Sequence, residues 1–181
     1  MTFSILGFDK NKNEFGIAIC SAVPCIGEFF VFGDGSAGII AAQGSFNPYN
    51  GLKGIEMLKQ NFSPNEILIK LKEQDSYIQK RQIAILSRNG KMSCFTGESL
   101  GNGQKLHIIS DEIIVCGNTL ADIDTVELMK KSFENNKEES LYLKQHADNP
   151  VNWKIFHTPS FEEAKKKNLP IFLSIGYSSC H

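Results

Sequence analysis

The sequence predicts an α+β fold, with helices packed on an antiparallel sheet or on a pair of such sheets. Two observations lead to this prediction. Apolar segments of strand length come in hairpin pairs, and amphipathic helical segments stand between these pairs and after them. The 181 residues, of which 41% are hydrophobic and 22% charged, suit one globular core.

A hairpin opens the chain. Residues 2–8 (TFSILGF) and 15–21 (FGIAICS) are short apolar runs separated by polar residues, which is typical of two antiparallel strands. Residues 38–43 (GIIAAQ) follow a glycine-rich turn and predict a central strand. The first strand is thus expected to begin almost at the N-terminus.

Two helices are predicted over about 50–73, where apolar residues recur at spacings of three and four. Ser63, Pro64 and Glu66 supply an N-cap, a first-turn proline and a capping-box acid for the second helix. After them, 82–87 (QIAILS) and 91–95 form a second predicted hairpin, closed by an Asn-Gly turn.

The chain continues with a short predicted strand at 113–116 (IIVC) and an amphipathic helix at 122–133. The polar run that follows is the predicted boundary, with a first domain at 1–135, a linker at 136–140 and a separate segment at 141–181.

Charge and cysteine content narrow the function classes. A net charge of -1 gives no broad attraction to nucleic acid or to acidic membranes, so neither is an expected partner. The five cysteines are odd in number and lack metal-ligand spacing, which predicts buried free thiols and no metal site. No cofactor is expected. Because the start shows no secretory signal and no long apolar run occurs, the expected location is the cytoplasm.

Thr2 is the candidate catalytic nucleophile. After removal of Met1 its free α-amino group could accept the proton of its own hydroxyl, so that one residue supplies both nucleophile and base. The pKa of such an amine, about 7.7–8.0, lies close to operating pH. No histidine is needed, and the four histidines show no spacing typical of a catalytic triad.

Seven blocks carry a resemblance to a known family. They are 1–5 (MTFSI), 15–21, 38–48 (GIIAAQGSFNP), 49–58, 80–85 (KRQIAI), 95–97 (FTG) and 117–120 (GNTL). In this order they resemble domain of unknown function 1028, an uncharacterised family similar to the N-terminal-nucleophile (Ntn) hydrolases. The resemblance implies a four-layer α/β/β/α sandwich, with the N-terminal residue at the mouth of a cleft between the sheets.

The resemblance also implies roles for five residues. Thr2 would be nucleophile and base, and Asn118, in a predicted Gly-Asn-Thr turn, would donate to the oxyanion. Gln43 would hydrogen-bond the substrate, and Arg81 and Gln82 would hold a carboxylate or carbonyl.

Each role has a structural alternative. Asn118 could be a turn residue that bonds its own backbone. Arg81 could form a surface ion pair with Glu73 or Asp75. Gln43 could be a satisfied core amide, and the Thr96-Gly97 pair is expected to form a turn.

The chain departs from the family pattern in two places. Ala22 and Val23 stand where many members have a basic or aromatic pair, so a cation near the nucleophile would have to come from elsewhere. A further helical region and a last strand are expected after 122–133 and are missing, so the domain is expected to be incomplete at its C-terminal side.

Residues 142–181 resemble another family, the start of the thioredoxin-like domain of the spermatogenesis-associated, domain of unknown function 255 group. The resemblance rests on Trp153 and its neighbours, a helix at 161–167 and a strand at 170–176 that leads to Cys180. Cys180 would open a Cys-x-x-Cys pair, but the sequence ends at His181. This predicts a truncated fusion. The alternative is that 141–181 replaces the missing helix and strand of the first domain.

The leading hypothesis is an Ntn-type amidohydrolase that cleaves a small amide-containing substrate through a Thr2 acyl-enzyme. A non-catalytic binding module of the same fold is the alternative, favoured if Met1 is retained. A thiol-disulfide protein dependent on Cys180 is the third hypothesis. Oligomeric state stays open, a homo-oligomer included.

Overall fold

A computed structural model describes residues 1–135 and residue 166. The strands are β1 (Thr2–Asp9), β2 (Glu14–Ser21), β3 (Val31–Asp34), β4 (Gly38–Gly44), β5 (Arg81–Ser87), β6 (Met92–Thr96), β7 (Gln104–Ile109) and β8 (Ile113–Leu120). The helices are α1 (Ile26–Phe30), α2 (Pro48–Lys59), α3 (Pro64–Gln74) and α4 (Asp124–Asn135), with a 3₁₀ helix at Ile78–Lys80. Contacts divide the chain into the units Met1–Lys131 and Ser132–His181, and the description below concerns the first.

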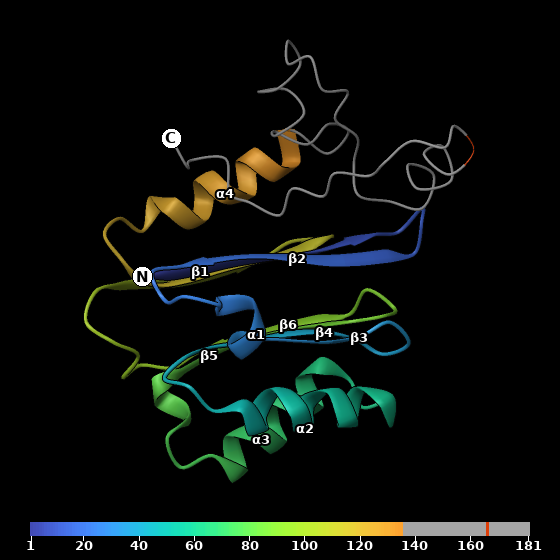
Figure 1. Ribbon diagram of the computed structural model, residues 1–181, viewed down its shortest axis with the longest axis horizontal. Coiled ribbons are helices and arrows are strands. Elements are labelled where there is room, and N and C mark those ends of the chain that lie inside the picture. The colour runs from blue at the N-terminus through green and yellow to red at the C-terminus, as the bar shows by residue number, and fades with distance from the viewer. Residues whose placement is uncertain (136–165, 167–181) are drawn as a thin grey trace. The chain divides into compact units, whose positions relative to one another are not determined.

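Two four-stranded antiparallel sheets face each other in this unit (Figure 1). The first has the order β2-β1-β8-β7 and the second β3-β4-β5-β6. Helices α2 and α3 cover the outer face of the second sheet, and residues 124–131 of α4 lie over the outer face of the first (Figure 1). The predicted α+β class with antiparallel sheets is confirmed.

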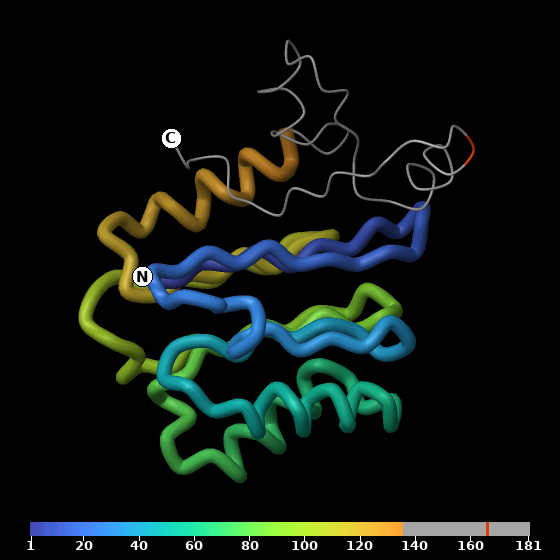
Figure 2. Tube along the Cα trace, in the orientation of Figure 1, coloured from blue at the N-terminus to red at the C-terminus, as the bar shows by residue number. Residues whose placement is uncertain are grey.

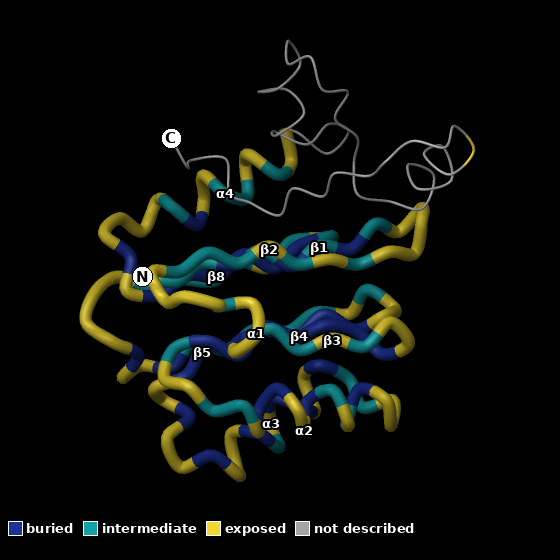
Figure 3. The backbone as a smooth tube through the Cα atoms, viewed as in Figure 1, coloured by how far each residue is buried: buried dark blue, intermediate teal, exposed yellow. Residues whose placement is uncertain are grey.

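Alternating side chains fill the space between the sheets. Leu6 and Phe8 of β1 meet Ile39 of β4, Leu86 of β5 and Ile114 of β8 in one buried cluster. Residues two apart on a strand point to the same face, so Ser4 and Thr2 also face this space. Figure 3 shows β4, β5 and β8 as buried strands, and every residue of β5 is buried.

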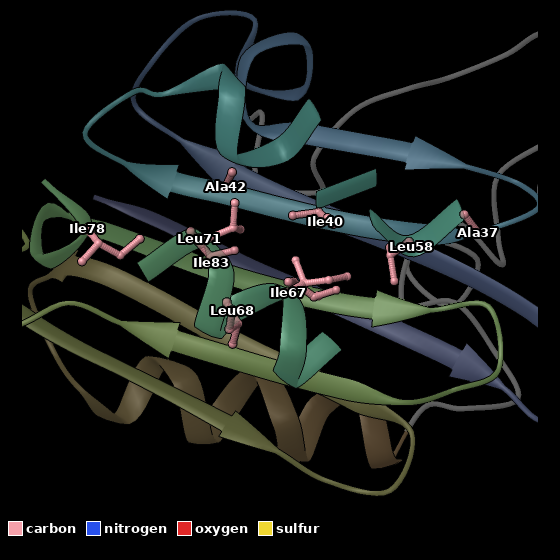
Figure 4. Packing of buried hydrophobic residues seen from close by; sticks show 10 residues of the cluster. Ala37, Ile40, Ala42, Leu58, Ile67, Leu68, Leu71, Ile78 and Ile83 are labelled. Carbon is pink, nitrogen blue, oxygen red and sulfur yellow. The ribbon is translucent and has the colours of Figure 1, made fainter. Parts of the chain in front are cut away.

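A second core joins α2 and α3 to the sheet beneath them (Figure 4). Its helical members Ile67 and Leu71 are fully buried, as are Ile40 and Ile83 of the sheet. The start of α3 is fixed by the expected capping box, because the Ser63 backbone N–H donates to the Glu66 carboxylate at 2.8 Å. This core packs α2 and α3 against the outer face of the second sheet.

The predicted hairpins, the central strand at 38–43 and the three helices are confirmed. Elements β3, β7 and α1 were not predicted. Asn118 was expected in a turn, which is wrong: β8 continues to Leu120, with a left-handed residue, Thr119 (φ 53), inside the strand. The linker at 136–140 and, apart from residue 166, the segment at 141–181 with Cys180 lie outside the described residues. None of the described helices has the length and apolar character that crossing a membrane requires.

Candidate functional site

Four strand ends that carry predicted site residues lie at one end of the paired sheets. Strand β1 begins where β8 ends, with Thr2 and Asn118 directly opposite each other. In the other sheet β4 ends where β5 begins, with Gln43 opposite Gln82. Figure 2 shows the chain entering β1 at the end of the sheet from which β8 leaves toward α4. The fold thus gathers residues that are up to 116 positions apart in sequence.

Thr2 is partly buried and faces the space between the sheets. Its hydroxyl lies 2.9 Å from the hydroxyl of Ser21, its partner on β2. Ser21 donates its own proton to the carbonyl of Met1 at 3.2 Å, so the Thr2 hydroxyl is the donor in the bond between them. With Met1 attached, the nitrogen of Thr2 is a peptide nitrogen and cannot serve as a base.

Asn118 lies beside Thr2 and is only 4% exposed. Its Nδ2 donates to Oε1 of Gln82 at 3.1 Å, across the gap between the sheets. Directly opposite residues of an antiparallel pair have Cβ atoms about 4.5–5.5 Å apart, which places the Asn118 amide within reach of a group bonded to the Thr2 hydroxyl.

Gln43 and Gln82 are fully buried and bond each other, with Nε2 of Gln43 donating to Oε1 of Gln82 at 2.6 Å. Gln43 Oε1 accepts from the hydroxyl of Ser4 at 3.0 Å. Ser4 also lies 3.1 Å from the Sγ of Cys116. These bonds match the structural alternative of a satisfied core amide for Gln43 and extend it to Gln82.

The structure adds a contact between Thr96 and His107 to the site, which sequence analysis did not predict. Thr96 was expected to form a turn, but it is the last residue of β6 and its hydroxyl lies 2.8 Å from Nδ1 of His107 on β7. Thr96 also accepts from Nε2 of Gln82 at 2.9 Å. Burial lowers the pKa of His107 below its usual 6.5. No spacing in the sequence signals this pair, because it forms between two sheets.

Arg81 is turned away from Thr2. It alternates with Gln82 along β5 and therefore faces the helices, where its Nε donates to Asp75 at 3.0 Å. The pair is buried, with side chains 11% and 7% exposed, so the predicted ion pair with Asp75 is present but is no surface pair. Burial by itself raises the pKa of Asp75, and hydrogen bonds from Arg81, Asn50 and Asn47 outweigh burial and lower this pKa to about 2.

Among the described cysteines, the predicted burial of the thiols is only partly observed. Cys116 is buried, Cys20 and Cys94 are partly exposed, and Cys25 is exposed. Although Cys94 is partly exposed as a residue, its thiol group is buried, and this burial and then the neighbouring Cys116 raise the pKa of the thiol. Within the described part of the chain, no three His, Cys, Asp or Glu side chains gather in a way that could hold a metal ion.

A cavity of about 480 Å³ opens at the opposite end of the sheets. It is lined by the turn between β3 and β4, the start of α3 and the turn between β5 and β6, with Ser36, Ser63 and Arg88 among its residues. None of the predicted site residues lines it. It is therefore separate from the cluster around Thr2.

Comparison with known families decides the relationship. The sequence profile of the family of unknown function DUF1028 matches residues 2–146. This chain belongs to that family. A crystal structure of a DUF1028 protein from Silicibacter pomeroyi superposes with a TM-score of 0.70 and 28% identity, over 74% of this chain and 61% of that one. The DUF1028 chain described here thus spans about three fifths of that protein.

The C-terminal part is similar to a second family. The profile described as protein of unknown function, DUF255, matches residues 133–181. Spermatogenesis-associated protein 20 of Rattus norvegicus is 59% identical over 44 residues, and an uncharacterized protein of Caenorhabditis elegans is 48% identical over 59. The aligned segments cover 24% and 32% of this chain but only 6% and 8% of those proteins. The suspected pairing of two families in one chain is therefore confirmed.

Proposed function

We propose that the DUF1028 region is an Ntn-type amidohydrolase that uses Thr2 as nucleophile once Met1 is removed. The observation that carries this proposal is the pairing of Thr2 with Asn118 at the end of the sandwich where β4 ends and β5 begins. Nucleophile, proton acceptor and an amide N–H donor then occupy adjacent positions on two neighbouring strands.

Each group has a chemical task in this proposal. Removal of Met1 frees the amine of Thr2, which takes the hydroxyl proton as the oxygen attacks the substrate carbonyl. Asn118 lies opposite Thr2 and supplies an N–H for the oxyanion of the tetrahedral intermediate. The amine then returns its proton to the leaving nitrogen, and water cleaves the acyl-enzyme. The hydroxyl of Ser21 lies 2.9 Å from that of Thr2 and helps to position it before reaction.

The test joins intact mass with an acylating probe. The purified protein should have lost Met1, and a β-lactone should acylate it once, at Thr2. Thr2→Ala should abolish labelling and Thr2→Ser should retain some of it, because a hydroxyl and an α-amine remain. Thr125→Ala, which removes a hydroxyl from α4, is the control and should label normally.

A variant with a blocked amine separates the two parts of the mechanism. An N-terminal extension that retains Met1 keeps the Thr2 hydroxyl but removes the base, so labelling should be lost as fully as in Thr2→Ala. Equal labelling of the trimmed and extended proteins would mean that the amine is not the base, and the mechanism would have to be dropped.

A binding module without catalysis is the second candidate function. It is favoured by the carboxamides of Gln43 and Gln82, which are 0% exposed and bond each other, while Gln82 also accepts from Asn118. Satisfied amides of this kind stabilise a fold without any substrate. The experiments above also decide this case, because a trimmed, folded protein that no acylating probe modifies at Thr2 would support the binding module.

A further inference from the structure

The fully buried Gln82 makes hydrogen bonds to both sheets. Its Nε2 donates to the Thr96 hydroxyl at 2.9 Å on its own sheet. The same nitrogen lies 3.0 Å from the carbonyl of Gly117 and 3.2 Å from that of Leu106, on β8 and β7 of the other sheet. Its Oε1 receives Asn118 and Gln43. Gln82 therefore has protein partners at both ends of its carboxamide and is placed to hold other groups instead of substrate.

The two carbonyls fix which way this carboxamide points. A carbonyl oxygen can only accept, so the end of Gln82 that faces Gly117 and Leu106 must be the NH₂ end. The oxygen of Gln82 must then face Asn118. Because that oxygen can only accept, Asn118 must turn its own NH₂ end toward it and donate. The backbone of the first sheet thus sets the orientation of an amide in the second sheet, and that amide sets the orientation of Asn118.

The orientation of Asn118 matters for the site. An NH₂ group has two hydrogens, and one of those on Asn118 points to Gln82. The second stays on the same nitrogen and is not used by Gln82, and Asn118 is the residue directly opposite Thr2. A carboxamide turned by 180° would place its oxygen there, and an oxygen would repel a developing oxyanion.

We infer that Gln82 is a positioning residue that holds the NH₂ end of Asn118 toward Thr2, and that it does not bind substrate. The catalytic half of this inference rests on the proposed function, and the orientation of Asn118 does not. The family resemblance predicted that Gln82 contacts a substrate carboxylate or carbonyl. The inferred role replaces that contact with a hydrogen bond that positions Asn118.

The test compares two buried substitutions. Gln82→Met keeps the length of the side chain and removes the acceptor that holds Asn118. Labelling of Thr2 by the β-lactone should slow by at least about tenfold, toward the roughly 10²- to 10³-fold loss known for removal of one oxyanion donor. Ser4→Ala is the matched control, because it removes a buried hydroxyl bonded to Gln43 but leaves the bond between Gln82 and Asn118. It should label at a rate close to wild type.

Gln82→Glu, which keeps a hydrogen-bonding group, should restore part of the labelling rate that Gln82→Met loses. In Gln82→Glu a protonated carboxyl can donate to the Gly117 carbonyl and still accept from Asn118, and burial favours that protonated form. Gln82→Glu should therefore label faster than Gln82→Met. Labelling of Gln82→Met at the wild-type rate, or equally slow labelling of Ser4→Ala, would overturn the inference.

Solvent exchange of the Asn118 side-chain amide, followed by NMR, gives a readout without activity. Exchange should be slow in the wild type, slow in Gln82→Glu and fast in Gln82→Met. If the wild type is not labelled by the β-lactone, the proposed function fails, but exchange still decides whether Gln82 holds Asn118. Slow exchange in Gln82→Met overturns the positioning role. Should that variant not fold, fast exchange in folded Gln82→Glu overturns it instead.

Discussion

The space between the two sheets has an apolar half and a polar half, although the same strands form both. Along β1 the side chains facing this space change from Leu6 to Ser4 and Thr2. Along β8 they change from Ile114 and Cys116 to Asn118. Similar changes occur on β4 and β5, where an alanine gives way to a glutamine at the same end.

The two halves are stabilised in different ways. The apolar half depends on packing volume, so a change there costs free energy through the cavity that it leaves. The polar half depends on paired donors and acceptors, so removing one partner leaves another group buried without its bond. Four of its side chains, those of Ser4, Gln43, Gln82 and Asn118, are at most 4% exposed. The stability of this buried polar cluster therefore depends on its paired hydrogen bonds.

The largest effect on stability is expected in the apolar half. Leu6 is 0% exposed and lies in the cluster between the sheets. Leu6→Ala should lower the free energy of unfolding by about 3–5 kcal/mol, because it loses buried methyl groups and leaves a cavity. Urea denaturation measures this loss. Leu52→Ala is the control, since Leu52 is 52% exposed on α2 and should change stability little. Similar losses for the two variants would contradict the assignment of this core.

A smaller effect is expected at the buried ion pair beside the polar half. Asp75→Asn keeps the shape of the side chain but removes the charge that faces Arg81, whose Nε lies 3.0 Å away. The free energy of unfolding should fall by about 1.5–3 kcal/mol, the range for a hydrogen bond to a charged group. Chemical denaturation at neutral pH tests this, and a loss as small as that of Leu52→Ala would contradict it.

The ion pair of Asp75 and Arg81 also makes the free energy of unfolding depend on pH. The pKa of Asp75 is about 2 in the folded protein against an ordinary value of 3.8. Between these values the unfolded chain binds a proton that the folded chain does not, so the stabilisation is complete well above 3.8 and is lost as pH falls toward 2. Asp75→Asn should lack this part of the acid dependence. Equal slopes for wild type and variant in denaturation between pH 5 and pH 2.5 would rule out the ion pair as its source.

Sequence patterns predicted the long elements and missed the short ones for physical reasons. The hairpin of β1 and β2 and the helices α2 and α3 have strong local periodicity and caps. Strand β3 has four residues, and β7 mixes polar and apolar residues after a glycine-rich stretch. Only pairing with distant strands makes them strands.

The site was predicted unevenly for a related reason. Gly-Asn-Thr favours a turn, and Thr119 does adopt a left-handed φ, but pairing of β8 with β1 and β7 carries the strand through it. The other site contacts depend on which face of its strand each residue occupies. Gln82 and Arg81 are neighbours in sequence, yet only Gln82 faces Asn118. The contact between Thr96 and His107 joins two sheets, and no local pattern encodes it.

The smallest effect is expected at His107, at the edge of the polar half. The Thr96 hydroxyl accepts from Gln82 and lies 2.8 Å from Nδ1 of His107, and which of these two atoms donates depends on the tautomer of the ring. Burial lowers the pKa of His107 below 6.5, so folding favours the neutral ring over the charged one. Below pH 6.5 the unfolded chain binds a proton that the folded chain does not, and the free energy of unfolding should fall with pH there.

His107→Asn tests this while keeping a hydrogen-bonding partner for Thr96, because the Asn carboxamide can both donate and accept. The variant should lose less stability than the wild type between pH 7.5 and pH 5.5 in urea denaturation. The three other histidines are present in both proteins, so their contributions cancel in the comparison. The difference should be smaller than at Asp75, because His107 is only half-buried and solvent reduces the cost of its charge. Identical slopes, or an NMR titration midpoint of His107 at or above 6.5, would show that the polar half tolerates a charged ring.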